Sequence, residues 1–297
     1  MPEIPEVEAL AEALSARTVG HRVARTALAD LSALKTVDPS LADLKGAVVE
    51  DIERQGKFIV WSLVTQDGEQ VFLVIHLSRA GWIRWVDSPS NVPPKPGRGP
   101  LALRIGFADA AGDVVGGIDV TEAGTRKRLA IYVVRDPRDV PGITRLGPDP
   151  LAADFTPARF DEILDAAGGK QIKGVLRNQS VIAGIGNAYS DEILHAARIS
   201  PFAAAGRLTE EQRMALFAAI RGQLFAAIAR AAGTAPETLK AEKKASMAVH
   251  GRAGEACPVC GNTVREVSFA DSSLQYCPTC QTDGKILADR RMSRLLK

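Results

Sequence analysis

The stretch KGVLRNQSVIAGIGNAYSDEILHAARISP (Lys173–Pro201) places a glycine-rich break between two apolar-faced helical segments. Val175 and Leu176 end the first segment, Gly184–Gly186 predicts a tight turn, and the next helix starts at Asn187. Such a turn presents backbone N–H groups and the positive end of a helix dipole, which together hold a phosphate. Asn187 is expected to act as N-cap or to donate its side-chain amide to that phosphate. A helical hairpin without a ligand is the alternative.

Helical patterns continue on both sides of this turn. They begin after Leu146–Leu151 (LGPDPL), where the strand patterns of the preceding residues end. In the longest pattern Leu216, Ile220 and Leu224 recur every four residues, which predicts a buried stripe along one helix. Residues 233–250 are polar and contain several lysines, which predicts a connection to the zinc segment. The predicted helices cover residues 157–168, 170–178, 188–199 and 209–233.

Short apolar or alternating runs dominate residues 20–150 and predict strands. The Pro/Gly-rich residues 88–100 are expected to form a loop, because strands resume after them. Strands in this number, behind a first helix, predict an antiparallel β-sandwich. The predicted strands are residues 47–53, 57–64, 71–77, 101–107, 113–120 and 129–134.

Composition indicates an ordinary globular protein of two or three domains, with 297 residues, 46% hydrophobic and 24% charged. The chain has no run of about 18 uncharged apolar residues and no secretory signal pattern, so we expect a cytoplasmic protein without a membrane span. The net charge of +2 is too small to indicate a polyanionic partner. The local distribution of basic residues is more informative.

All four cysteines lie in the C-terminal part of the chain, as two CxxC pairs. Cys257, Cys260, Cys277 and Cys280 match the pattern of a tetrahedral four-thiolate Zn²⁺ site. Two disulfides are the alternative, which a cytosolic location disfavours. Four protein ligands leave no open position for water, so one structural zinc is expected to supply the folding free energy of this segment.

The chain starts with MPEIPEVEAL, in which Pro5 suits the first turn of a helix. Val7, Leu10 and Leu14 then follow with helical spacing. This explains Pro5 but gives Pro2-Glu3 no role beyond that of common residues at the start of a helix.

The whole of Lys173–Pro201 resembles the helix–two-turn–helix of the formamidopyrimidine-DNA glycosylase / endonuclease VIII family. The family's other landmarks follow in the family's order, so the resemblance spans essentially the full chain. They are PEIPEVE, the GK of RQGKFIVW, the IHL before the next turn, LGPDPL, HGRAGEACPVCG and the four-cysteine finger.

The resemblance implies an α+β multi-domain protein. We expect an N-terminal helix with an antiparallel β-sandwich in residues 1–150, a helix–two-turn–helix DNA-binding domain in residues 151–245, and a zinc finger with a basic tail in residues 246–297. The implied partner is double-stranded DNA with a damaged base or abasic site, bound by a monomer in the cleft between the sandwich and the helical-plus-zinc half.

The implied activity is a bifunctional DNA glycosylase and β-elimination lyase of base-excision repair. Once the initiating Met1 is removed, Pro2 carries a secondary amine that can attack C1′ of a deoxyribose and form a Schiff base. An α-amine has a pKa of roughly 7.7–8, so a useful fraction is unprotonated near neutral pH. Glu3 is then the general acid/base, and Glu6 mainly a partner of the helix dipole.

Two further residues follow from the resemblance rather than from their pattern. Lys57 is expected to contact the phosphate that flanks the lesion, whereas most lysines at the start of a strand are merely solvated. His76, at the end of an apolar strand, is expected either to contact a phosphate or to have a structural role.

This chain departs from its relatives where side chains fill the gap left by the flipped nucleotide. Arg79 replaces the usual methionine, and EAGTRKRLA (122–130) replaces the usual acidic-Pro-Arg-Arg-Phe-Gly loop. Arg126, Lys127 and Arg128 keep positive charge there, and Leu129 occupies roughly the place of the phenylalanine. An arginine can stack on bases or pair with their edges, so insertion into DNA remains expected, whereas the preferred opposite base is open.

Three more departures lie around the finger. Ser272 stands where related fingers carry an arginine, and it offers one hydrogen bond to a phosphate but no charge. The connection 233–249 is shorter than the segment that closes over oxidised purines, so recognition of 8-oxoguanine is not assumed. A tail follows Cys280, and its extra DNA contact is an alternative to a frayed end. Its charged residues sum to +3: Lys285, Arg290, Arg291, Arg294 and Lys297 against Asp283 and Asp289.

Two other classes of function remain as alternatives. A non-catalytic binder of distorted DNA agrees with Ser272 and the missing phenylalanine, but it does not explain Pro2, Glu3 and Lys57. An RNA-binding helical hairpin leaves the N-terminal residues unexplained too. Among substrates, abasic sites depend least on a base pocket, so abasic-site cleavage is favoured over base-specific excision.

Overall fold

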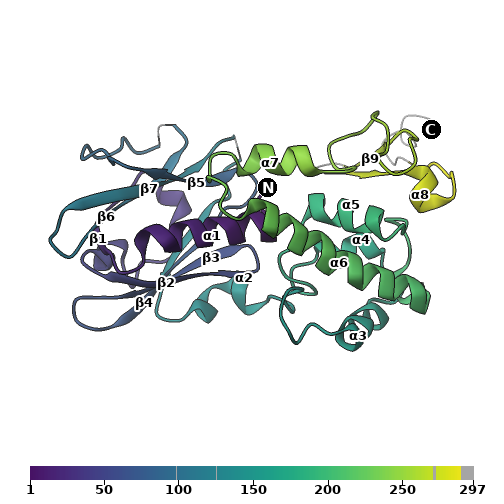
Figure 1. Ribbon diagram of the computed structural model, residues 1–297. Coiled ribbons are helices and arrows are strands. Elements are labelled where there is room, and N and C mark those ends of the chain that lie inside the picture. The colour runs from purple at the N-terminus through teal and green to yellow at the C-terminus, as the bar shows by residue number, and fades with distance from the viewer. Residues whose placement is uncertain (98, 125, 270–271, 289–297) are drawn as a thin grey trace. The chain divides into compact units, whose positions relative to one another are not determined.

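The computed structural model describes residues 1–97, 99–124, 126–269 and 272–288 (Figure 1). Its chain forms two compact units. The first contains Met1–Arg145 and Ala231–Leu239, and the second contains Leu146–Arg230 and Lys240–Lys297. The basic side chains predicted beyond residue 288 lie outside the described residues.

Eight antiparallel strands build the first unit, in the order β5-β7-β6-β1-β2-β3-β4-β8. β1 and β2 share one pair in register, Arg22 with Val48, so the sheet is nearly divided into two four-stranded halves. Trp61 of one half stacks on Phe107 of the other, with ring centroids 5.6 Å apart, as expected of two packed layers. The strands are β1 (Arg22–Leu28), β2 (Val48–Gln55), β3 (Phe58–Val64), β4 (Gln70–His76), β5 (Gly81–Val86), β6 (Leu101–Ala108), β7 (Val114–Glu122) and β8 (Ala130–Val134).

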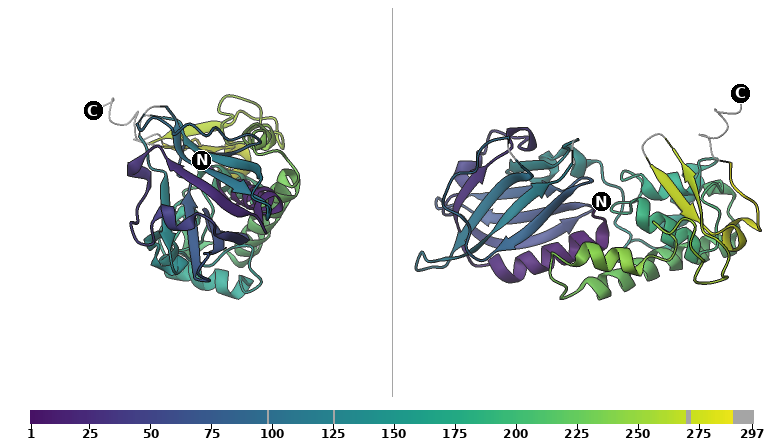
Figure 2. Two further views of the ribbon diagram at one scale, coloured as in Figure 1. Left: turned by 90° about the vertical axis from the view of Figure 1, so that its left-hand side faces the viewer. Right: turned by 90° about the horizontal axis from the view of Figure 1, so that it is seen from above.

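Helix α1 (Ile4–Thr18) packs on β2 and β3, as the right-hand view of Figure 2 shows. Val7, Leu10 and Leu14 are buried in the sandwich core, which confirms the predicted apolar face. Short helical segments complete the unit: α2 (Pro141–Thr144) and the 3₁₀ turns Leu31–Ala33, Leu41–Leu44 and Pro137–Asp139.

Helices dominate the second unit, and the predicted stripe of Leu216, Ile220 and Leu224 is fully buried. Within the predicted connection 233–250, the lysine-containing part forms α7, whose first residue, Leu239, packs into the sandwich core. The helices are α3 (Pro157–Ala167), α4 (Ile172–Arg177), α5 (Asn187–Ala196), α6 (Glu210–Ala231) and α7 (Leu239–Ser246), with a 3₁₀ turn at Ala205–Arg207.

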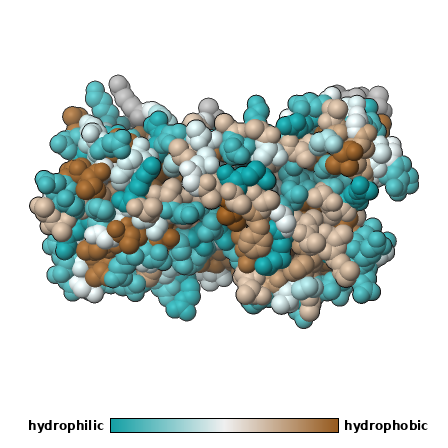
Figure 3. Space-filling view, in the orientation of Figure 1, coloured by the Kyte–Doolittle hydropathy of each residue, from teal (hydrophilic) through white to brown (hydrophobic). Residues whose placement is uncertain are grey.

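By length and composition, α6 also meets the criteria for a membrane span, which the sequence analysis did not expect. Arg221 lies inside α6, and the buried stripe of α6 is typical of a helix that packs against a protein core. Met214 and Phe225 remain exposed, and Figure 3 shows apolar residues gathered over this helix.

The C-terminal segment forms a two-stranded hairpin, β9 (Arg265–Ser268) and β10 (Ser273–Tyr276), followed by α8 (Pro278–Thr282). Val267, Leu274 and Tyr276 make one small apolar cluster. Val249, Val264, Cys257 and Cys277 make another.

Candidate functional site

The start of α1 holds Pro2 and Glu3 in buried positions, with Glu3 only 1% exposed. Glu3 is the N-cap residue and forms a capping box with Glu6, whose carboxylate accepts a 2.9 Å hydrogen bond from the Glu3 backbone N–H. Glu6 therefore caps the helix, as its predicted role beside the dipole requires. The capping box fixes the backbone next to Pro2.

Arg54, on β2, connects α1 to the turn that carries Lys57. It forms an ion pair with Glu8 of α1, and its Nη1 donates a 3.3 Å hydrogen bond to the carbonyl of Gly56. Lys57 follows Gly56 directly and is only 7% exposed, so it is not an ordinary solvated surface lysine. Burying an ammonium group costs free energy unless the charge is compensated, so a buried lysine in a turn indicates a specific electrostatic role.

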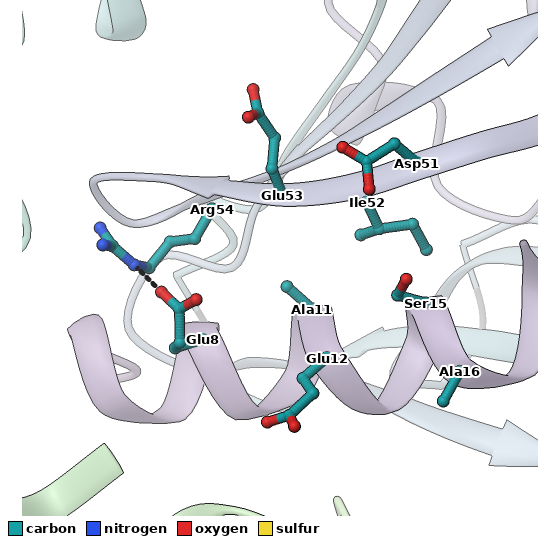
Figure 4. A pocket seen from close by; sticks show the side chains of 9 residues that line it. All are labelled: Glu8, Ala11, Glu12, Ser15, Ala16, Asp51, Ile52, Glu53 and Arg54. Atoms are coloured by element: carbon teal, nitrogen blue, oxygen red, sulfur yellow. Dashed lines mark hydrogen bonds and ion pairs between the residues drawn. The ribbon is translucent and has the colours of Figure 1, made fainter.

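Beside this ion pair, a groove of about 510 Å³ runs between α1 and β2 (Figure 4). Its charged lining consists of four carboxylates and one guanidinium, so it is unsuited to a polyanion. The lining residues are Glu8, Ala11, Glu12, Ser15, Ala16, Asp51, Ile52, Glu53 and Arg54.

His76, at the end of β4, pairs in register with Phe58 on one side and Ala130 on the other. Its ring lies against Phe58, with centroids 4.6 Å apart. Burial, and next the charge of Lys57, lowers the His76 pKa to about 4. The imidazole is therefore neutral at pH 7 and offers a hydrogen bond rather than a charge.

The two arginine-bearing segments lie side by side at this end of the sandwich. Gly81, after the Arg79 turn, pairs with Glu122, and the Ala123 N–H donates to the carbonyl of Ala80. Arg79, Arg126 and Arg128 are all exposed. The structure thus brings together three of the predicted DNA-contacting arginines.

Leu129, which occupies roughly the place of the missing phenylalanine, is buried. It is 2% exposed and belongs to the sandwich core, and the Glu122 carboxylate binds its backbone N–H. A side chain held in this way is not available to enter DNA.

In the second unit, the predicted turn between α4 and α5 is present, and Gly184 has a φ of 83°, which favours glycine. Gln179 holds this turn, since its Oε1 accepts from the Gly184 N–H at 2.9 Å and its Nε2 donates to the Ile185 carbonyl at 2.7 Å. The sequence analysis missed Gln179, because a polar residue before a glycine turn resembles ordinary loop sequence.

Asn187 is not the N-cap of α5. Gly186 takes that position and Asn187 is the first helical residue. The Asn187 Nδ2 donates to the Ser273 carbonyl at 2.8 Å, and its Oδ1 is buried without a hydrogen-bond partner in the described part of the chain. Ser272 lies next to Ser273 at the hairpin turn, so the structure brings Asn187 and Ser272 close together.

A buried polar network on α5, which the sequence analysis also missed, connects the helices to the segment before the finger. Lys173, 5% exposed, binds Asp191 at 2.6 Å and Ser190 at 2.7 Å. The other Asp191 oxygen lies 2.7 Å from Nδ1 of His250. The Glu192 carboxylate accepts hydrogen bonds from the backbone N–H groups of residues 248–250. In the sequence, this network is indicated by the run Ser190-Asp191-Glu192 in α5 and by the pair His250-Gly251 before the finger.

The four cysteine sulfurs lie within 4.8 Å of one another. Cys257 Sγ is 3.9 Å from Cys280 Sγ, and Cys260 Sγ is 3.3 Å from Cys277 Sγ. A tetrahedral zinc with Zn–S bonds of about 2.3 Å requires sulfurs roughly 3.8 Å apart, so the donor set fits that metal. His195 Nε2 lies 3.3 Å from Cys257 Sγ, and burial lowers the His195 pKa, which keeps this imidazole neutral beside the cluster.

Three family profiles match this chain in order. They are described as the formamidopyrimidine-DNA glycosylase N-terminal domain (residues 1–125), the formamidopyrimidine-DNA glycosylase H2TH domain (146–238) and a zinc finger found in FPG and IleRS (254–282). The formamidopyrimidine-DNA glycosylase of Symbiobacterium thermophilum is 35% identical over 302 residues, covering 98% of this chain and 93% of the relative. This chain belongs to the formamidopyrimidine-DNA glycosylase family.

Other relatives and solved structures of the family are also similar to this chain. An uncharacterized formamidopyrimidine-DNA glycosylase-like protein of Mycobacterium tuberculosis is 57% identical over 152 residues, which cover 51% of this chain and 94% of that protein. A structure of MutM bound to DNA that contains carbocyclic 8-oxo-G is 27% identical, with a TM-score of 0.80 over 95% of this chain and all of that one. Lactococcus lactis Fpg with abasic-site DNA is 26% identical, with a TM-score of 0.80 over 94% and 99%. The predicted family and fold class are therefore confirmed.

Proposed function

We propose that this protein is a DNA glycosylase and abasic-site lyase that acts on damaged DNA through a Schiff base on Pro2. The supporting observation is the start of α1, where Pro2 is buried and directly followed by Glu3, the N-cap residue. The family's solved relatives include complexes with abasic-site DNA and with 8-oxo-G DNA. A protein that only bound DNA would not need a proline amine at this place.

The reaction starts when the Pro2 nitrogen, freed by removal of Met1, attacks C1′ of the damaged nucleotide. The bond from C1′ to the base breaks and the base leaves with a proton; on an abasic site, water leaves instead. The resulting iminium is positively charged, so the C2′ proton becomes easier to remove and the C3′–O bond to the phosphate breaks. Glu3 moves the protons at the sugar oxygen and the leaving base.

DNA binding is assigned to both units. In the first, Lys57, His76 and the arginines 79, 126 and 128 lie at or beside the connected ends of β3, β4 and β8. In the second, Asn187 and Ser272 lie at the junction of α5 and the hairpin. Phosphate contacts of this kind supply the sequence-independent part of affinity.

The four cysteines are proposed to hold one Zn²⁺, which when bound supplies folding free energy to the finger rather than chemistry. Cys257, Cys260, Cys277 and Cys280 fill all four coordination positions, so no water is available for activation by this metal. The finger in turn supports the Ser272 hairpin turn that Asn187 contacts.

Borohydride trapping tests the proposal. Protein whose Met1 is shown to be absent is mixed with abasic-site duplex and sodium borohydride, which reduces the Schiff base to a stable adduct. Wild-type protein is expected to form the adduct. The control is the same chain with an uncleavable N-terminal extension, which turns the Pro2 nitrogen into an inert amide and is expected to form none.

The second candidate, a non-catalytic binder of distorted DNA, is favoured by Ser272 and by the loop that lacks a phenylalanine. It predicts binding of abasic-site duplex by both proteins and an adduct with neither. That outcome, in protein with a free Pro2 nitrogen, would replace the enzyme with the binder.

A further inference from the structure

Helix α6 is apolar on the face that points to solvent as well as on the face that is buried. Six exposed, uncharged side chains lie within about 60° of the direction opposite to its buried stripe, at the helical spacing of about 100° per residue. They form the outer face of α6: Met214, Ala215, Ala218, Gly222, Phe225 and Ala226. A helix that is apolar all round is usually covered on all sides. The outer face is therefore suited to a further contact.

The two large side chains of the outer face are well exposed, Met214 to 63% and Phe225 to 46%. Figure 3 shows apolar residues gathered over this helix. The arginines of α6 lie at its flanks and are used inside the second unit. Arg213 binds Asp165 at 2.6 Å, and Arg221 donates to two backbone carbonyls before α3 at 3.2 and 3.3 Å. These polar contacts hold α6 in its unit and leave the outer face uncovered by the described part of the chain.

Gly222, in the middle of the outer face, is not required by its surroundings in the described part of the chain. Glycine inside a helix is less favourable than alanine. A Cβ placed on Gly222 would meet no atom within 4 Å, so no neighbour excludes a side chain there. What the missing side chain does permit is the close approach of another backbone.

Phe225 is held in place before any partner arrives. The guanidinium of Arg221 lies over its ring, 5.2 Å from the centroid. Such a cation–π contact restricts the ring, which lowers the entropy lost when the ring is buried in an interface.

We propose that the outer face of α6 binds a second copy of this chain, with the two helices antiparallel about a twofold axis at the level of Ile220. Ideal helical spacing then places Met214 beside Phe225 of the second copy, and by symmetry the same contact forms twice. A methionine sulfur against an aromatic ring is a favourable contact. Ala218 and Gly222 lie where the helices cross, so the backbones can approach closely.

Charge favours the antiparallel orientation. The first turn of α6 carries Glu210 and Glu211, and its last turn carries Arg230. Antiparallel helices bring the acidic turn of one copy to the basic turn of the other, whereas parallel helices would bring like charges together. A contact along one helix of 22 residues, roughly 33 Å long, is at the small end of specific interfaces. We therefore expect a reversible dimer with a Kd in the micromolar range, in place of the monomer that the resemblance implies.

Sedimentation equilibrium of the zinc-loaded full chain without DNA, from about 1 to 200 µM, tests the proposal. Wild-type protein is expected to pass from monomer to dimer over this range. Gly222→Gln should raise the Kd roughly tenfold or more, because its side chain separates the helices. The control is Gly174→Gln, which changes an exposed glycine of α4 with equally open surroundings and should leave the Kd unchanged. Both variants should melt about 1–2 °C above wild type at low concentration, since each replaces a helix glycine.

A pair of charge changes tests the orientation. Glu211→Lys should weaken the dimer about threefold, and adding Arg230→Glu should restore it. Further weakening in the double variant would overturn the antiparallel arrangement. Wild-type protein that stays monomeric, or Gly222→Gln protein that dimerises like wild type, would overturn the second copy as the partner. Monomeric protein that sediments with phosphatidylcholine vesicles would assign the outer face to lipid instead.

Discussion

The β-sandwich and the zinc finger are stabilised in different ways. The sandwich has one continuous apolar core that includes α1, Trp61 and Phe107. The described residues of the finger include two small apolar clusters beside the four cysteines and several polar contacts. A small apolar core supplies little folding free energy, so the finger depends on its metal and on buried hydrogen bonds. Site residues in the sandwich can therefore be changed with less risk to the fold than those around the finger.

Zinc removal is expected to have the largest effect, and to affect the finger but not the β-sandwich. A structural zinc contributes on the order of 10 kcal/mol, so chelation should unfold the finger and abolish DNA binding. All three tryptophans, Trp61, Trp82 and Trp85, lie in the first unit, so their fluorescence should remain unchanged while circular dichroism shows lost structure. Full DNA affinity in metal-free protein would contradict the role given to the finger.

Glu3→Gln should lower the single-turnover rate of abasic-site cleavage by about 100-fold or more, because the general acid/base is lost. The melting temperature should change little, since the side-chain oxygen of glutamine can still accept the hydrogen bond from the N3 backbone N–H. Glu6→Gln is the matched control, with a smaller loss of rate, because Glu6 caps the helix. Equal losses in both variants would assign the effect to the cap instead of to proton transfer.

Lys173→Met should destabilise the second unit by about 3–5 kcal/mol, because it leaves the buried Asp191 without its lysine. The exposed Lys170 provides the control, and Lys170→Met should cost less than about 0.5 kcal/mol. Thermal unfolding of zinc-loaded protein measures both. Equal melting temperatures of the two variants would mean that His250 alone compensates the buried charge of Asp191.

Acid should weaken the sandwich through His76. Its folded-state pKa of about 4 lies below the ordinary value of 6.5, so between these values the unfolded chain binds a proton that the folded chain does not. The contribution of neutral His76 to the free energy of unfolding is complete above pH 6.5. It is lost as the pH decreases towards 4, by roughly 3 kcal/mol at most. Denaturant titrations followed by tryptophan fluorescence should show a smaller loss in His76→Gln; identical pH profiles would exclude this histidine as the cause.

Sequence patterns predicted the regular parts of this fold well. The six predicted strands, the face of α1 and the α6 stripe are present because apolar spacing determines which residues are buried. β1 was missed because its pattern RVARTAL buries only Val23 almost completely, and α7 because its lysines favour solvent although Leu239 is buried. Both elements depend on tertiary partners that lie far away in the chain.

At the candidate site, the sequence predicted which residues carry the chemistry but not what holds them. Arg54, Glu122, Gln179 and Glu192 act through backbone groups distant in sequence or across a turn, and no spacing rule indicates such contacts. A loop alignment gives the order of side chains, whereas the hydrogen bonds from Glu122 decide which of them face solvent.

The carboxylate-lined groove between α1 and β2 has a consequence for how fast the protein meets its substrate. A duplex that drifts towards Glu12 or Asp51 is repelled, whereas one that approaches the arginine-bearing turns is attracted, so unproductive collisions are shortened and productive ones are favoured. This bias acts over about 10 Å and fades as added salt screens it. We therefore expect these acidic residues to raise the share of encounters in which a duplex meets the arginine-bearing turns.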